Sequence, residues 1–259
     1  MFTDVKGTRV YYEIIGNSGS RVVLLHGWGC SSALMKGPAE ALKNDHRVLL
    51  IDFPGFGQSG KPPVPWGVPE YAECLYEILQ KLDFLPCAAV GHSFGCRVAA
   101  WIAAGRPEVF TRLVFTGAAG LRSVPTEEQK KRSEEYQRKK RFAEQIRKLP
   151  GMESAGSRLQ DKLRKKYGSA DYNALDEDMR RTFVKVVNQD LRECYPQMKQ
   201  STLLIWGDDD RETPLRMGQE MEKLIPDAGL VILEGGSHFA YLEQAERFNA
   251  IVKYFLAEE

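Results

Sequence analysis

The sequence has no long hydrophobic run, and nowhere does it approach the roughly 18 consecutive apolar residues that cross a bilayer. It also lacks a basic segment followed by an apolar one near its start, so no secretory signal is expected. Its five cysteines show no paired spacing, which argues against a disulfide framework. These absences predict a protein of the reducing cytoplasm that has no membrane partner.

An excess of charge of either sign is lacking too. Lysines and arginines number 36 and aspartates and glutamates 35, which leaves a formal net charge of +1. A balance of this kind gives no general attraction to nucleic acid. The 259 residues are 43% hydrophobic and 27% charged, a composition typical of a globular protein with ample material for a core.

Short apolar runs alternate with helical stretches along most of the chain. This alternation predicts a mainly parallel sheet with helices on both faces, and ligands that bind at the carboxyl ends of its strands. The expected strands span 5–15 (a hairpin), 21–25, 47–51, 87–90, 112–116, 202–206 and 230–233. The expected helices span 68–82, 94–104, 214–224 and 242–256.

One region breaks this rhythm, because 121–198 contains no strand candidate. Its sequence is helical and heavily charged, with Gly/Ser breaks at 151–156 and 168–169. An apolar stripe at helical spacing predicts one helix over 126–149 (Tyr136, Phe142, Ile146, Leu149) and a second over 171–191 (Leu175, Met179, Phe183, Val187, Leu191). We therefore expect a core domain of 1–120 and 199–259, with 121–198 inserted as a helical cap.

The segment that ends in Gly95 carries the strongest functional signal. Its pattern Gly-x-Ser-x-Gly, centred on Ser93, follows a buried apolar run and precedes a helical stretch. A nucleophile elbow needs this order of strand, tight turn and helix, because the turn exposes the serine hydroxyl above the sheet. The two glycines let strand and helix approach each other closely. Ser93 is therefore the predicted nucleophile.

A serine hydroxyl needs a base that accepts its proton and a carboxylate that orients the base. In this architecture the order along the chain is serine, acid, histidine. Of the four histidines only His238 follows Ser93, and it lies on a glycine-rich loop between an expected strand and the last helix. His238 is therefore the predicted base.

The acid is expected after the strand 202–206, where the sequence contains Asp208, Asp209 and Asp210. Three adjacent aspartates resemble a metal cluster, but no spaced ligands from elsewhere accompany them, and aspartate is favoured in a turn before a helix. Asp210 is the predicted acid, because it lies three residues past Gly207 and four before the proline that begins a helix. No metal and no cofactor are predicted.

An oxyanion hole needs two backbone N–H groups at the point where the carbonyl oxygen becomes charged. One donor is expected from Phe94, the residue after the nucleophile. The second is expected from Trp28, in the glycine-rich loop 26–29 that follows the strand 21–25.

Five ordered motifs give the chain a resemblance to the α/β-hydrolase superfamily. They are the segments 26–29, 52–59, 91–95, 207–214 and 236–239, and the resemblance covers about residues 5–120 and 200–257. It implies an α/β fold with a mostly parallel sheet of about eight strands, helices on both faces, and a cap inserted after the sixth strand. Cys96 departs from many relatives, which have a second glycine there, but cysteine is small enough to keep the helix close.

The site residues predict a serine hydrolase that cleaves a small-molecule ester or related acyl bond through an acyl-enzyme. Superfamily members that cleave carbon–halogen bonds or epoxides carry an aspartate at the elbow, so Ser93 argues against both. Similar proteins also include thioesterases, lyases and hydrolases of carbon–carbon bonds. A slow-turnover ligand receptor that retains the triad is a further alternative. The sequence leaves these open, because pocket residues come from the cap.

The expected cap is strongly basic over part of its length. Between residues 122 and 166, fifteen lysines and arginines stand against seven aspartates and glutamates. A charge run of this kind is usually a solvated helical face. The alternative is that the basic face attracts an acidic substrate or an acidic partner.

Overall fold

The structure is a computed structural model that describes residues 1–122, 127–168 and 170–257. The chain divides into two compact units. The core unit comprises Met1–Leu121 and Val184–Glu259, and the helical unit comprises Arg122–Phe183.

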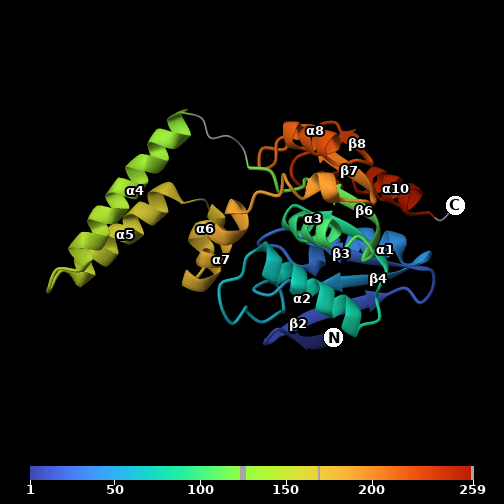
Figure 1. The fold of residues 1–259 in the computed structure, drawn as a ribbon, viewed down its shortest axis with the longest axis horizontal. Coiled ribbons are helices and arrows are strands. Elements are labelled where there is room, and N and C mark those ends of the chain that lie inside the picture. The colour runs from blue at the N-terminus through green and yellow to red at the C-terminus, as the bar shows by residue number, and fades with distance from the viewer. Residues whose placement is uncertain (123–126, 169, 258–259) are drawn as a thin grey trace. The chain divides into compact units, whose positions relative to one another are not determined.

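The described part of the core unit contains one eight-stranded sheet, with the spatial order β1-β2-β4-β3-β5-β6-β7-β8 (Figure 1). Strand β2 pairs antiparallel with both β1 and β4, and all the later pairings are parallel. The predicted mostly parallel α/β sheet is therefore confirmed. The strands are β1 (Phe2–Val5), β2 (Thr8–Ile15), β3 (Ser20–Leu25), β4 (His46–Ile51), β5 (Cys87–His92), β6 (Phe110–Thr116), β7 (Ser201–Gly207) and β8 (Ala228–Leu233).

Helices cover both faces of this sheet. On one face, α1 (Lys36–Leu42) packs against α10 (Ala245–Leu256), and both cover the strand side chains that point towards that face. On the other face α2 (Val68–Lys81) packs with α3 (Phe94–Gly105). Helix α8 (Leu215–Leu224) belongs to this second face, because its Gly218 lies against the ring of Trp206.

Two helical features differ from the expectation. The short helix α1 was not predicted, because seven residues interrupted by Pro38 carry too little apolar periodicity. The helix expected over 242–256 is divided into α9 (Ala240–Glu243) and α10, with Gln244 at φ −119° between them.

The helical unit contains α4 (Glu127–Arg147), α5 (Glu153–Tyr167), α6 (Ala170–Ala174) and the start of α7 (Glu177–Asn188). Helices α4 and α5 lie side by side (Figure 1). A break between helices was expected over residues 151–156, but α5 already begins at Glu153, so the expectation is wrong for 153–156. Gly156 lies inside α5, where a Cβ would come within 2.5 Å of the Arg147 Cα, so this glycine lets the two helices approach closely.

The apolar stripe predicted for the first helix of this unit is wrong at two of its four positions, since Tyr136 and Ile146 are half-buried but the other two are not. Phe142 and Leu149 are 59% and 54% exposed, whereas Ala143 is fully buried. The helix expected over 171–191 is two helices, and the side chain of Asp176 accepts the N–H of Met179 at the start of the second (3.0 Å). The expected start of the first helix at residue 126 lies outside the described residues.

Two absences hold for the described ranges. None of their helices combines the length and the apolar character needed to cross a bilayer. No disulfide bond joins any of the five cysteines. Short strands alternating with amphipathic helices account for both the sheet and its helical layers.

Candidate active site

Ser93 lies in a strained turn between β5 and α3. Its backbone has φ +49° and ψ −103°, a conformation that costs an L-residue about 1–3 kcal/mol. Neighbouring backbone groups hold it there: the Ser93 N–H donates to the carbonyl of Thr116 (3.1 Å), and the Ser93 carbonyl accepts the N–H of Ala119 (3.2 Å). The turn presents the hydroxyl at the carboxyl end of the parallel strands.

The glycines on either side of Ser93 are required by close backbone approach. A Cβ on Gly95 would lie 2.4 Å from the carbonyl oxygen of Leu25, and one on Gly91 would lie 3.0 Å from the amide nitrogen of Cys96. Helix α3 therefore begins directly against the ends of β3 and β5. Cys96 is buried beneath the turn, where its thiol contacts the carbonyl of Thr116.

His238 and Asp210 form a hydrogen-bonded pair on two loops that follow β8 and β7. His238 Nδ1 lies 2.8 Å from Asp210 Oδ2, and the carboxylate side chain is fully buried. Oδ2 also accepts the hydroxyl of Thr213 (2.8 Å), and Oδ1 accepts the backbone N–H groups of Glu212 (2.9 Å) and Thr213 (2.8 Å). Thr213, which the sequence analysis missed, thus binds the same carboxylate as the histidine.

These contacts determine the charge of the pair. Burial on its own would raise the pKa of Asp210, but the hydrogen bonds from His238 and Thr213 outweigh it and hold the pKa below its ordinary value. An ionised carboxylate can only accept a hydrogen bond, so this contact favours the tautomer of His238 with its proton on Nδ1. In that tautomer Nε2 can accept a proton.

The two neighbouring aspartates have other roles. Asp208 Oδ1 accepts the N–H of Gly235 (2.7 Å), and Asp209 forms a surface ion pair with Arg211 (3.4 Å). Across the described residues, no group of three or more His, Cys, Asp or Glu side chains is arranged to hold a metal ion. Of the three aspartates, Asp210 is the one that contacts His238.

The ends of β5, β6 and β7 bring these groups together. His238 passes over Gly117, at the end of β6, where a Cβ would lie 3.1 Å from His238 Nδ1 and 3.3 Å from Asp210 Oδ2. On its other side the His238 ring lies 4.8 Å, centroid to centroid, from the ring of His92, the residue before Ser93. Within the described residues no hydrogen bond joins Ser93 Oγ to His238, and such catalytic contacts often tighten only when substrate binds.

The side chains of the two residues predicted to supply the oxyanion donors, Trp28 and Phe94, lie beside each other. Phe94 is the first residue of α3, where backbone N–H groups have no acceptor within the helix. The ring of Trp28 meets the ring of Phe94 edge to face, with centroids 5.3 Å apart. A Cβ on Gly27 would lie 3.5 Å from the Ser93 Cβ, so the loop after β3 packs directly against the elbow.

Two buried polar residues missed by the sequence analysis support the loop after β3. His26 Nδ1 lies 2.7 Å from the carbonyl of Gly27, and His26 Nε2 accepts the N–H of Phe53 (2.9 Å). Asp52 accepts the backbone N–H groups of Ser32 and Gln58, each at 2.7 Å. The only sequence signal was their position in the motifs 26–29 and 52–59.

We expect the free energy of unfolding to fall as the pH drops below about 6.5. Burial lowers the pKa of His26 to about 4 and that of His92 to about 3, so both stay neutral in the folded protein. At pH values between the ordinary histidine pKa and these lowered values, both histidines are protonated in the unfolded chain but neutral in the folded protein. Stability is therefore complete above about pH 6.5 and is lost on acidification, by at most about 1.4 kcal/mol per pH unit for each histidine.

Urea unfolding between about pH 7 and about pH 4.5 measures this slope. His92→Gln should give a shallower slope, because it removes one of the two buried imidazoles. Identical slopes for this variant and the parent protein would contradict the assignment of a neutral, buried His92.

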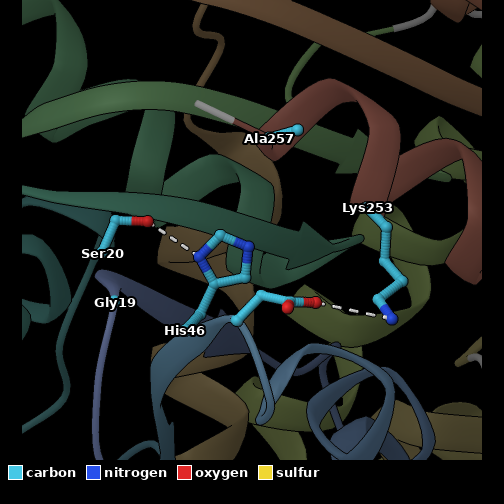
Figure 2. Close-up of a pocket in the computed structure, with 6 residues that line it drawn as sticks. Gly19, Ser20, His46, Lys253 and Ala257 are labelled. Atoms are coloured by element: carbon cyan, nitrogen blue, oxygen red, sulfur yellow. Dashed lines mark hydrogen bonds and ion pairs between the residues drawn. The ribbon is translucent and has the colours of Figure 1, made fainter. Parts of the chain in front are cut away.

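A second serine–histidine pair lies at the opposite edge of the sheet. Ser20 Oγ is 2.7 Å from His46 Nδ1, and the two residues begin the parallel strands β3 and β4 (Figure 2). The pair borders a cavity of about 280 Å³, beside the ion pair of Asp45 with Lys253 (3.6 Å). Ser20 starts a strand and has no helix N-terminus beside its hydroxyl, so this pair lacks the geometry of a nucleophile elbow.

The comparison with known families agrees with this geometry. The model of the alpha/beta hydrolase fold family matches residues 20–245. The chain belongs to the α/β-hydrolase family.

Three similar proteins illustrate the range of the family. The pimeloyl-[acyl-carrier protein] methyl ester esterase of Aliivibrio fischeri is 24% identical over 96% of this chain and 98% of its own length. The 2-hydroxy-6-oxononadienedioate/2-hydroxy-6-oxononatrienedioate hydrolase of a Pseudomonas species is 28% identical over 96% of this chain and 92% of its own. The crystal structure of the enol-lactonase of Burkholderia xenovorans LB400 superposes with a TM-score of 0.76 at 23% identity, over all of both chains.

Proposed function

We propose that this α/β-hydrolase is a serine hydrolase that cleaves a small-molecule ester or related acyl bond. The observation that carries the proposal is the buried Asp210–His238 hydrogen bond, 2.8 Å long, beside the strained turn at Ser93. Nucleophile, base and orienting carboxylate come from three different strand ends. A serine hydroxyl needs such a base and carboxylate to become a nucleophile near neutral pH.

In the proposed mechanism Ser93 Oγ attacks the acyl carbonyl carbon while His238 Nε2 takes the hydroxyl proton. Asp210 stabilises the resulting imidazolium, and the backbone N–H groups of Trp28 and Phe94 donate to the oxygen that gains negative charge. The imidazolium then protonates the leaving alcohol as its bond to the acyl carbon breaks. Water, losing a proton to His238, attacks the acyl-enzyme, releases the acid and restores the serine hydroxyl.

Two relatives support two reaction types. One is a methyl ester esterase, and the other is a hydrolase of 2-hydroxy-6-oxononadienedioate, a compound that contains no ester bond. Ester cleavage is the reaction that we propose. Hydrolysis of a carbon–carbon bond is the second candidate, because the relative that acts on the 2-hydroxy-6-oxo compound has the higher identity of the two, 28% against 24%.

Turnover of a substrate panel tests the proposal. The panel holds short p-nitrophenyl esters, an acyl thioester, a lactone and a 2-hydroxy-6-oxo dienoate, each in large excess over the enzyme. Repeated turnover of the esters supports the proposal, and turnover of the dienoate alone favours the carbon–carbon reaction. One unreleased product per chain would indicate a receptor, and no product from any member would reject a hydrolase.

We also propose that residues 121–198 act as a cap that helps to select the substrate. Helix α4 carries an excess of basic residues on one exposed side, where Lys131, Arg138 and Arg141 lie with Glu134 and Glu135. An anionic substrate or an acidic partner would be attracted by such a surface through long-range electrostatics.

If the basic surface steers substrate, the kcat/KM for a carboxylated ester should fall steeply between low and physiological salt. A neutral ester of equal size should change little. Replacing Lys131 and the exposed Lys140 by Glu should reduce the salt dependence for the carboxylated ester. Lys139 is a poorer site for this test, because it contacts Glu135 and the Tyr167 hydroxyl.

Stopped-flow or steady-state rates of the two esters over a salt series measure this effect. A double replacement on the core unit, Lys199→Glu with Lys223→Glu, is the matched control, because both residues are exposed and lie on a different unit. Equal salt profiles for the two esters would leave the basic surface as a solubility feature.

A further inference from the structure

His92 links the strand that carries Ser93 to the loop that carries His238. It ends β5 and precedes Ser93, and its side chain is 1% exposed. Its Nε2 lies 3.0 Å from the carbonyl oxygen of His238, within hydrogen-bonding distance. Its ring also packs against Phe239 (5.0 Å) and Tyr241 (4.8 Å).

The loop that carries His238 is anchored unevenly. Towards β7 it is held by residues 208–213: Asp209 N–H donates to Gly236 O (3.0 Å), Gly235 N–H donates to Asp208 (2.7 Å), and His238 Nδ1 contacts Asp210 (2.8 Å) and the Thr213 hydroxyl (3.2 Å). Towards β5, where Ser93 lies, the described residues supply a single hydrogen bond to residues 234–239, the one from His92. Without it, nothing polar ties the histidine to the strand that carries the nucleophile.

We propose that His92 is a positioning residue that keeps the His238 ring over the end of β5, within reach of Ser93. The inference rests on the proposed function, since it gives His92 the task of fixing the distance between nucleophile and base. Because His92 directly precedes Ser93, a shift of one is transmitted to the other. The x before serine in the Gly-x-Ser-x-Gly motif is thus a structural link rather than a spacer.

The hydrogen bond to the His238 carbonyl determines which ring nitrogen of His92 carries the proton. A carbonyl accepts a hydrogen bond, so the proton of His92 lies on Nε2 and Nδ1 carries none. Nδ1 is buried without a hydrogen-bond partner and faces the loop after β3, where a Cβ on Gly27 would come within 2.6 Å of it. A glycine at 27 is therefore required by the position of the His92 ring.

His92 must also remain uncharged beside the base. The titratable groups that face it are His238, Asp210, His26 and Tyr241. Burial, and then the proximity of His238, lower the pKa of His92 to about 3, so the ring stays neutral while His238 cycles between its two charge states. A permanent cation at this position would oppose the imidazolium that forms during catalysis.

Two substitutions separate positioning from packing. His92→Leu removes the donor and keeps a buried apolar side chain, whereas His92→Gln retains an N–H donor at a similar reach. Titration with a fluorophosphonate counts the active sites that have a reactive Ser93, and dividing the maximal rate by this number gives kcat per active site. We expect His92→Leu to lose about 100-fold in this kcat with KM nearly unchanged, the loss typical of a misplacement of about 1 Å. His92→Gln should recover most of it.

His46→Gln is the matched control, because His46 is also buried and bonded to a neighbouring side chain but lies at the opposite strand ends. It should lower the melting temperature without changing kcat per active site. An unchanged kcat in His92→Leu, or a Gln variant as slow as the Leu variant, would overturn the proposal.

A measurement on the parent protein covers the case in which His92→Leu does not fold. In ¹⁵N-histidine NMR, with His92 assigned from the Gln variant, the ring should show a protonated Nε2 and no titration down to about pH 5. A protonated Nδ1 or a near-neutral titration would overturn the proposal. Because this readout needs no turnover, it tests the hydrogen bond between His92 and the His238 carbonyl separately from the proposed function.

Discussion

Ser93→Ala is expected to lower kcat by at least about 10⁴-fold while the protein stays folded, because members of a catalytic triad act as a unit. Removing the hydroxyl removes the atom that forms the acyl-enzyme. The methyl group of alanine is no larger than the serine side chain, so the packing at the carboxyl edge of the sheet is unaffected. Steady-state rates of the parent protein and the variant measure the loss of kcat, and circular dichroism shows whether the variant is folded.

Ser93→Gly separates activity from backbone strain. Both variants lack the nucleophile, so both should be inactive. The conformation at φ +49°, ψ −103° is unfavourable for alanine as for serine but accessible to glycine. The release of about 1–3 kcal/mol of strain should outweigh the 0.5–1 kcal/mol or so that glycine loses in chain entropy. The glycine variant should therefore melt above the alanine variant.

A fluorophosphonate probe identifies the reactive serine directly. We expect peptide mapping to find the label on Ser93 alone. Ser20 serves as an internal control, since it too lies within hydrogen-bonding distance of a histidine, His46, but at the wrong edge of the sheet. Labelling of Ser20, or near-native turnover in Ser93→Ala, would refute the mechanism.

The sequence was sufficient to predict the elements that depend on local pattern. The strand before Ser93, the turn and the helix after it follow from an apolar run, two glycines and a helical stretch. The parallel sheet follows from the alternation of strands and helices. Chain order alone selected His238, because no other histidine follows Ser93.

Features that depend on long-range packing could not be predicted. Thr213 and His92 contact His238 from two separate strand ends, and no local pattern marks either contact. In α4 the small Ala143 is buried while the larger Phe142 is exposed. An apolar stripe identifies the side chains able to pack, but Gly156 determines where α5 approaches α4.

Asp210→Asn should lower kcat by about 10⁴-fold, because an amide N–H can donate a hydrogen bond to an unprotonated His238 Nδ1 and so favours the wrong tautomer. The Asp210 carboxylate accepts four hydrogen bonds and donates none. An asparagine would keep its oxygen towards the backbone N–H groups of Glu212 and Thr213, which leaves its NH₂ group facing the histidine. His238 Nε2 would then hold the proton and could not take one from Ser93.

Asp208→Asn and Asp209→Asn are the matched controls on the same loop. Asp208 accepts a single backbone N–H, which an asparagine oxygen can still accept, and Asp209 lies on the surface with a side chain that is 64% exposed. Both variants should keep kcat within about threefold of the parent, since neither touches the histidine. The pH–rate profile of Asp210→Asn adds a second readout, because its residual activity should rise at alkaline pH. A loss at Asp208 equal to that at Asp210 would show that the orienting carboxylate has been assigned to the wrong residue.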